Sequence, residues 1–208
     1  MSSGSGRGYW CSKKYLSGWV LPNRIFYIFA ALFDNGTKNM RTNAISVANY
    51  LIDKDKAIRG EDLTIVGLVK LVYFVHGFTL AIYNKPAIDQ RFDKVEAWKY
   101  GPIIPSVYHT FIHNGVNPIT EKGVILDKDE EGNFVAVEPK LEDKDIMAVC
   151  DMVLKRYKDK QEREIVDLTH RPVTPWGVTY EEGKNLPIDD IKTRVYYEMV
   201  IEDEIQRV

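Results

Sequence analysis

The sequence predicts a mainly α-helical, α+β fold: a compact helical domain around one buried central helix, with a small β-hairpin. Residues 64–83 are apolar on more than one face, which is typical of a helix at the centre of a domain. Several shorter segments carry apolar residues at helical spacing. The short apolar runs 124–126 and 134–137 flank a charged loop that contains Gly132, and this pattern predicts a hairpin.

The composition limits the class of protein. The chain has 208 residues, of which 45% are hydrophobic, and a chain of this size buries roughly 70% of its surface on folding. That suffices for one core. The net charge of -2 provides no global field for a phosphate backbone, so nucleic acid is not favoured as a partner. Cys11 and Cys150 have no CxxC spacing, which argues against a zinc ribbon or a disulfide framework and favours a reducing, cytoplasmic compartment.

Residues 1–39 differ from the rest of the chain, because they carry five basic residues against one acid. The apolar run 25–33 is shorter than the about 20 residues needed to cross a bilayer. No small-residue cleavage pattern follows it. We therefore expect an N-terminal extension at 1–39, upstream or accessory, a helical domain at 40–208, and no membrane association.

The first elements follow in chain order. Thr42 or Asn43 can cap a short amphipathic helix, and Asp62 or Thr64 opens the central helix, which residues 84–86 stop. Residues 91–100 form a short strand or an extended arm.

A turn at Gly101 and Pro102 is expected after that arm. Pro105 suits the first turn of another helix, which Gly115 ends. The charged hairpin then follows.

The C-terminal third is expected to be helical. One helix begins at Asp143 or Asp145 and runs to Lys160, with Cys150 as a packing residue, and a shorter one covers 165–170. Pro172 and Pro175 interrupt the chain before a last helix over roughly 188–205. Residues expected to face inward on this helix are Ile191, Val195, Tyr196, Met199, Val200 and Ile205.

Histidines provide the main candidates for catalysis. His109 and His113 are four residues apart, so on one helix they could share a metal ion. Thr110 stands where a HExxH motif needs glutamate, so the interpretation of both residues as surface histidines is favoured. His76 is expected to be a core histidine with a hydrogen-bond partner. The chain has no GxSxG, P-loop or GxGxxG motif, so we expect no catalytic residues, no metal and no cofactor.

Two blocks are more informative. Residues 97–108, AWKYGPIIPSVY, combine rigid aromatic rings with Gly101 and two prolines. They predict either a strand-to-helix corner that closes the core or a protein-binding surface. Residues 167–176, DLTHRPVTPW, contain Thr169 and His170, whose side chains can fasten the loop by hydrogen bonds or contact a partner.

Together with residues 67–77, GLVKLVYFVHG, these blocks resemble the Panacea domain, a family that includes SocA-like antitoxins and phage-associated GepA proteins. The blocks occur in the family's order, and the resemblance covers about residues 44–197. It implies a helical, non-enzymatic antitoxin of a bacterial or prophage type II toxin–antitoxin system, which binds a cognate protein toxin directly. A SocA-like variant of that mechanism would deliver the toxin to a ClpXP-type protease.

The resemblance also implies a set of partner-binding positions. They are Trp98, Tyr100, Gly101, Pro102, Pro105, Tyr108, His170 and Trp176. It names neither the toxin nor an oligomeric state. Two alternatives stay open: a metal-dependent hydrolase that uses His109, His113 and an acidic residue, and a DNA-binding autorepressor whose basic element is residues 1–39.

Overall fold

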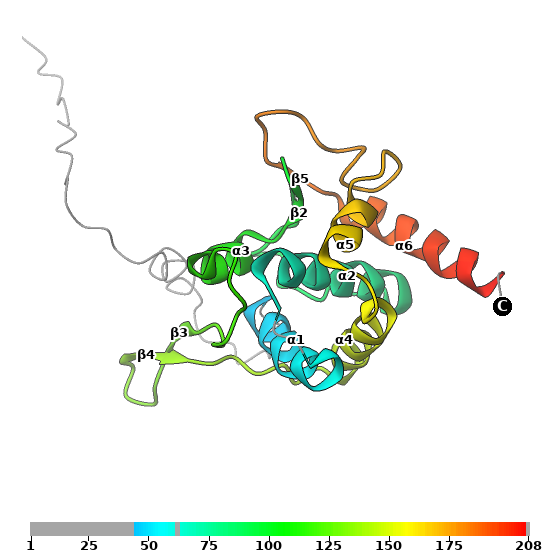
Figure 1. The fold of residues 1–208 in the computed structure, drawn as a ribbon. Helices are drawn as coiled ribbons and strands as arrows, with labels where there is room; N and C mark the ends of the chain where they lie inside the picture. Colours follow the sequence, from blue (N-terminus) through cyan, green and yellow to red (C-terminus); the bar gives the residue numbers. More distant parts are fainter. Residues whose placement is uncertain (1–43, 61–62, 207–208) are drawn as a thin grey trace, which may run out of the picture.

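The computed structural model describes residues 44–60 and 63–206, and its helices gather around one central helix (Figure 1). The helices are α1 (Ala44–Arg59), α2 (Ile65–Tyr83), α3 (Pro105–Phe111), the 3-10 turn η3 (Ile112–Asn114), α4 (Lys144–Tyr157), α5 (Glu162–Thr169) and α6 (Asp190–Ile205). The strands are β1 (Glu96–Trp98), β2 (Gly101–Ile103), β3 (Ile125–Lys128), β4 (Phe134–Val137) and β5 (Leu186–Pro187). The expected mainly helical class is confirmed. The N-terminal extension and the expected cap of the first helix lie outside the described residues.

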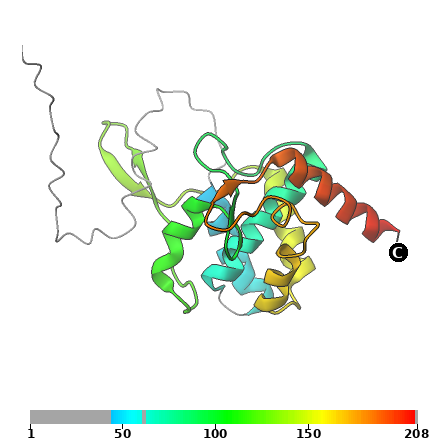
Figure 2. The same ribbon diagram turned by 90° about the horizontal axis from the view of Figure 1, so that it is seen from above.

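The central helix α2 is the core of the fold. The Thr64 side chain caps its first turn by accepting a hydrogen bond from Gly67 N–H, and the helix ends at Asn84 in the left-handed conformation. By length and composition α2 could cross a membrane, but 83% of its most apolar stretch is buried inside the fold. Helices α1, α4, α5 and α6 pack around it (Figures 1 and 2). Cys150 on α4 is fully buried in this core, in agreement with its expected packing role.

A small antiparallel sheet with the order β2-β1-β5 lies beside α2 and α3. The turn between β1 and β2 consists of Lys99 and Tyr100, because Gly101 already pairs with Trp98 across the two strands. The expected turn at Gly101 and Pro102 is therefore placed two residues too late. Pro102 is tolerated within β2 because β2 is an edge strand. The pairing of β5 with β1 carried no sequence signal, since β5 has only two residues.

The remaining elements agree closely with expectation. Strands β3 and β4 form the charged hairpin, with Ile125 opposite Val137 and Lys128 opposite Phe134. The Asp143 carboxylate caps α4 by accepting from the two N–H groups of Asp145 and Ile146. Helix α5 begins three residues earlier than expected, because a capping box joins its first turn.

The expected inward face of α6 is mostly wrong. Four of the six residues are exposed: Ile191 (66%), Val195 (45%), Met199 (58%) and Ile205 (71%), while Tyr196 and Val200 are half-buried. The helix instead packs on α2 through Thr193 and Tyr197, which are buried. The Tyr197 ring lies against Gly77 of α2, where the absence of a side chain lets the two helices approach. Thr193 and Tyr197 therefore lie at the centre of the packed face, and Tyr196, Val200 and Ile201 pack against the core beside them.

Candidate functional site

Three segments that are distant in sequence meet at Gly101. Lys70 comes from α2, Gly101 begins β2, and His170 follows α5. A Cβ atom on Gly101 would lie 2.6 Å from Lys70 Nζ and 2.7 Å from His170 Cε1. The φ angle of Gly101 is +99°, a conformation that other residues rarely adopt. The position therefore requires glycine for both space and backbone conformation.

The side chain of Lys70 holds this turn by two hydrogen bonds. Its side chain is 2% exposed, and Nζ donates to the carbonyl oxygens of Tyr100 (2.8 Å) and Pro102 (3.1 Å), which flank Gly101. Burial lowers the pKa of Lys70 to about 7. A neutral amine has two N–H groups, and these match the two carbonyl acceptors. Lys70 is absent from the expected set of site residues, although a lone lysine in an apolar helix was its signal in the sequence.

Trp176 also contacts this turn. Its indole Nε1 donates to the carbonyl oxygen of Trp98 (2.8 Å), and its ring lies 4.4 Å from the His170 ring. The Trp176 ring also stacks on Tyr180, with ring centroids 4.9 Å apart. His170 Nδ1 lies 2.8 Å from the Val166 carbonyl oxygen, a hydrogen bond that needs the proton on Nδ1.

The hydroxyl of Thr169 also donates to the Val166 carbonyl oxygen (2.8 Å). Thr169 and His170 thus fasten the loop, as the structural interpretation of residues 167–176 expected. The second block is therefore fixed to the first by Trp176 and to its own helix by these two side chains.

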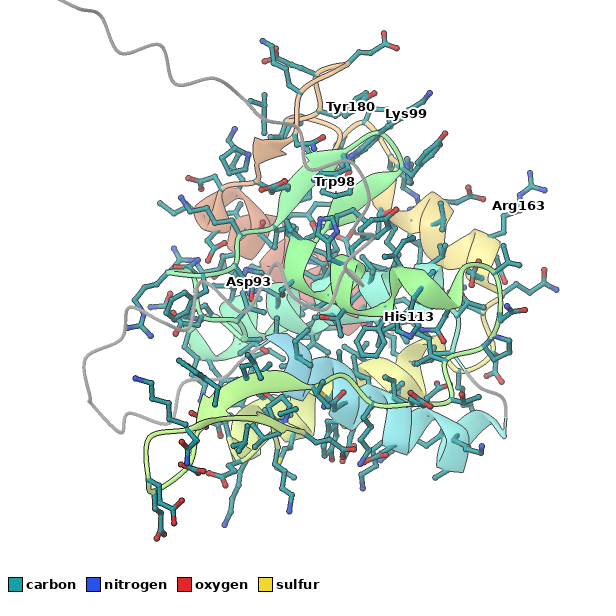
Figure 3. All side chains as sticks on the ribbon, turned by 90° about the vertical axis from the view of Figure 1, so that its left-hand side faces the viewer. Asp93, Trp98, Lys99, His113, Arg163 and Tyr180 are labelled. Carbon is teal, nitrogen blue, oxygen red and sulfur yellow. The ribbon has the colours of Figure 1, made fainter. Side chains whose placement is uncertain are left out.

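The outer rim of the turn is aromatic. The Trp98 ring meets the Tyr108 ring edge-on at 5.1 Å, and its indole N–H donates to Glu96 (2.7 Å). Tyr100 is 74% exposed, with Lys99 Nζ 5.5 Å from its ring centroid. We define the aromatic corner as Trp98, Tyr100, Tyr108, Trp176 and Tyr180. Figure 3 shows Trp98, Lys99 and Tyr180 close together at one end of the molecule, away from His113.

The eight positions expected to bind a partner fall into three groups. Tyr100 is exposed, Gly101 and Pro102 are buried, and the other five are half-buried: Trp98, Pro105, Tyr108, His170 and Trp176. Six of the eight belong to β1, β2, their turn or α3, and the other two, His170 and Trp176, contact these strands. Gly101 and Pro102 are buried and cannot contact a partner directly, so their role is to shape the turn.

The structure gives the two helical histidines no shared ligand set. The His109 ring packs against the rings of Trp98 and Tyr108, and His113 Nε2 lies 3.3 Å from Asn114 Nδ2. Within residues 44–60 and 63–206, no group of three or more His, Cys, Asp or Glu is placed to hold a metal ion. The part of the chain that the structure describes therefore offers no three-ligand metal group to the hydrolase alternative.

Two buried titratable groups lie elsewhere. His76 is fully buried and its Nε2 lies 3.1 Å from an Asp190 carboxylate oxygen, which agrees with the expected core histidine. Asp93 is 7% exposed in a cavity of about 470 Å³ that Asp189 and Asp190 also line, and burial raises the pKa of Asp93 to about 6. Neither group contacts the aromatic corner. The DNA-binding alternative rests on residues 1–39, which are outside the described residues.

Comparison with known proteins identifies relatives of this chain. A family model described as "Antitoxin SocA-like, Panacea domain" matches residues 68–177, which include Lys70, the aromatic corner except Tyr180, and His170. The antitoxin SocA of Caulobacter vibrioides (strain NA1000 / CB15N) is 33% identical over 138 residues, which is 65% of this chain and 69% of that protein. No solved structure matches the chain.

Proposed function

The chain belongs to the SocA-like Panacea family, and from this membership we propose that it is the antitoxin of a bacterial or prophage type II toxin–antitoxin pair. It acts in the cytoplasm without catalysis, by direct binding of a cognate protein toxin. The name of the Caulobacter relative and the order of the three sequence blocks support this proposal.

The toxin binds at the aromatic corner. The observation that carries this is the 74% exposure of Tyr100 on a turn whose neighbouring carbonyl oxygens are held by buried Lys70. An aromatic side chain on a rigid turn provides contact area at a small entropic cost, which is why such residues dominate many interfaces. The half-buried rings of Trp98, Tyr108 and Trp176 extend the surface, and Pro105 and His170 lie at its border.

Growth rescue tests the antitoxin role. The full chain is co-expressed with the small protein that the adjoining reading frame encodes, and the two are then co-purified. Rescue of growth together with a stable complex is the expected result. If the neighbouring protein is not toxic and forms no complex, the antitoxin proposal is wrong for this pair.

A substitution at the corner tests the docking site separately. Tyr100→Ala should weaken toxin binding at least about tenfold, because loss of an aromatic hot spot costs about 2 kcal/mol or more and about 1.4 kcal/mol corresponds to a factor of ten. Tyr83→Ala is the matched control, since Tyr83 is 40% exposed at the far end of α2. Both variants should keep the far-ultraviolet circular dichroism of the parent. Equal binding by Tyr100→Ala and the parent would refute this docking site while leaving the antitoxin role standing.

Toxin abundance distinguishes the two routes of neutralisation. Simple occlusion predicts that the toxin persists in the complex. Adaptor activity predicts that the toxin disappears in cells with a ClpXP-type protease and persists in cells without it. We favour direct binding as the common first step, because both routes require it.

A further inference from the structure

A cavity of about 370 Å³ opens among α2, the C-terminal end of α4, the loop that follows α5, and α6 (Figure 1). Pockets that bind small molecules have volumes of about 300–1,000 Å³. Five of the residues that line this one are aromatic: Tyr73, Phe74, Tyr157, Tyr196 and Tyr197. The residues of the aromatic corner do not line it, so the cavity is separate from the proposed toxin-binding surface. An aromatic wall of this kind suits a ligand with a planar ring.

The most deeply buried part of the wall carries an unpartnered hydroxyl group. Tyr73 is 2% exposed, and its Oη is buried without a hydrogen bond of normal geometry to any described residue. Burial raises the pKa of Tyr73 against the opposing effect of the nearby Tyr197 hydroxyl, so the Tyr73 hydroxyl stays protonated and can donate. A buried donor without an acceptor is unfavourable. An acceptor atom on a molecule in the cavity would remove this cost.

The charged residues of the wall favour an anion. Three are basic and two are acidic: Arg156, Lys160, Arg171, Asp203 and Glu204. Arg156 and Glu204 form an ion pair with each other, so their charges offset. What remains is two cations against one carboxylate, and the wall therefore has a net positive charge.

Arg171 is the cation that is free to bind a ligand. Its guanidinium forms no ion pair with any residue that the structure describes. Burial raises the pKa of Tyr196 and the charge of Arg171 opposes that rise, so the guanidinium lies close to the aromatic wall. Lys160 contributes less, because its Nζ lies 3.8 Å from Glu164 Oε1 at an exposed position.

We propose that this cavity binds a small aromatic anion. The ligand has a planar ring, an acid group at one end of the ring and a hydrogen-bond acceptor at the other. The ring packs among the tyrosines, the acid group pairs with Arg171, and the acceptor takes the hydrogen bond of Tyr73.

Ligand-detected NMR with the full chain tests the class of ligand. The probe is 4-hydroxybenzoate, because it has an acid group at one end of its ring and a hydroxyl oxygen at the other. We expect a Kd of about 1 mM or below, which is ordinary for a ligand of about ten non-hydrogen atoms. The neutral 4-hydroxybenzyl alcohol and the cationic 4-hydroxybenzylamine should bind at least about tenfold more weakly. Absence of 4-hydroxybenzoate binding, or equal binding of the three probes, overturns the proposal.

Replacement of Arg171 tests the position of the acid group. Arg171→Gln should weaken binding of 4-hydroxybenzoate about tenfold and leave the affinity for 4-hydroxybenzyl alcohol unchanged. Arg163→Gln is the matched control. Arg163 is also an exposed arginine, but it lies on α5, does not line the cavity and points away from the molecule in Figure 3, so this variant should bind like the parent. An equal loss in both variants would show a general effect of charge and overturn the site.

Tyr73→Phe tests the hydrogen bond at the buried end, because it keeps the ring and removes the hydroxyl. The parent should bind 4-hydroxybenzoate about fivefold more tightly than benzoate, which lacks the acceptor. Tyr73→Phe should bind the two probes equally. Circular dichroism checks that this variant and Arg171→Gln are folded. A preference for 4-hydroxybenzoate that survives in Tyr73→Phe would mean that the hydroxyl holds only a buried water, and it would overturn the proposed arrangement.

Discussion

At the scale of single residues, the candidate site depends on two positions with unusual physical demands. Gly101 has no room for a side chain, and Lys70 is a buried amine whose hydrogen bonds go to backbone carbonyl oxygens. The sequence indicated the need for glycine at a turn. It did not indicate that the lysine 31 positions earlier fills the space beneath it, because that contact depends on how α2 and β2 pack. The burial of Lys70 leads to a prediction about pH.

Lys70 should make the folded state more stable as the pH rises above neutrality. Its pKa is about 7 when folded and 10.5 in the unfolded chain, so between these values the unfolded state binds the additional proton. Below pH 7 the amine is charged in both states, and its burial is unfavourable. In this window, the free energy of unfolding of the parent minus that of Lys70→Met should rise by up to about 1.4 kcal/mol per pH unit. Urea unfolding at about pH 7, 7.5, 8 and 8.5 measures it.

The Lys70→Met variant removes the contribution of other titrating groups from this comparison. Burial also raises the pKa of the Cys150 thiol, which lowers stability once the pH passes the ordinary thiol value. Cys150 is present in both proteins, so its effect cancels in the difference. Parallel pH profiles for the two proteins would mean that Lys70 keeps its charge in the fold.

At the scale of elements, the central helix and the hairpin were predictable because each has a local signal. Helix α2 is apolar on all sides, and the hairpin has a loop with Gly132 between two apolar runs. Both patterns can be recognised without reference to the rest of the chain. Helix α6 was misread because its apolar and aromatic residues are spread around the whole helix, so their spacing does not single out the face that packs. Its packing on α2 depends on Gly77 and Tyr197, one residue from each helix.

That helix crossing reverses the usual effect of replacing glycine by alanine. In a helix interior this change is favourable by up to about 1 kcal/mol. At Gly77 a Cβ would lie 2.2 to 2.7 Å from three atoms of the Tyr197 ring, which is buried against Phe78 and cannot swing away freely. We expect Gly77→Ala to lower the free energy of unfolding by about 1–3 kcal/mol through overpacking. Equilibrium urea unfolding measures the difference.

Gly67 provides the control within the same helix. Its nearest neighbour for an added Cβ is Leu63 Cδ2 at 3.5 Å, an ordinary contact, so Gly67→Ala should be neutral or stabilising. Combining Gly77→Ala with Tyr197→Ala should cost less than the sum of the two single changes, because the second removes the ring that the first strikes. Additive costs would show that Gly77 does not set the approach of α2 and α6.

At the scale of the whole molecule, the residues of the candidate site could be identified from the sequence, but their arrangement in space could not. The blocks 67–77, 97–108 and 167–176 were each recognisable in the sequence, and the resemblance gave their order. Their convergence on Gly101 is created by contacts such as the hydrogen bond from Trp176 to Trp98, 78 positions apart. No local pattern encodes a pairing of that separation. The expected boundary between the N-terminal extension and the domain is also a property of the whole chain, because it depends on which residues form the core.

We expect residues 40–208 to fold without residues 1–39. The buried hydrophobic residues from Ala44 to Tyr197 form one contiguous core cluster, and it draws on α1, α2, α4 and α6 together. A domain with a complete core of its own retains its stability when a segment outside that core is removed. The free energy of unfolding of residues 40–208 should therefore equal that of the full chain within about 0.5 kcal/mol. A loss of more than about 2 kcal/mol, or aggregation of the shortened chain, would show that residues 1–39 cover part of the core and belong to the domain.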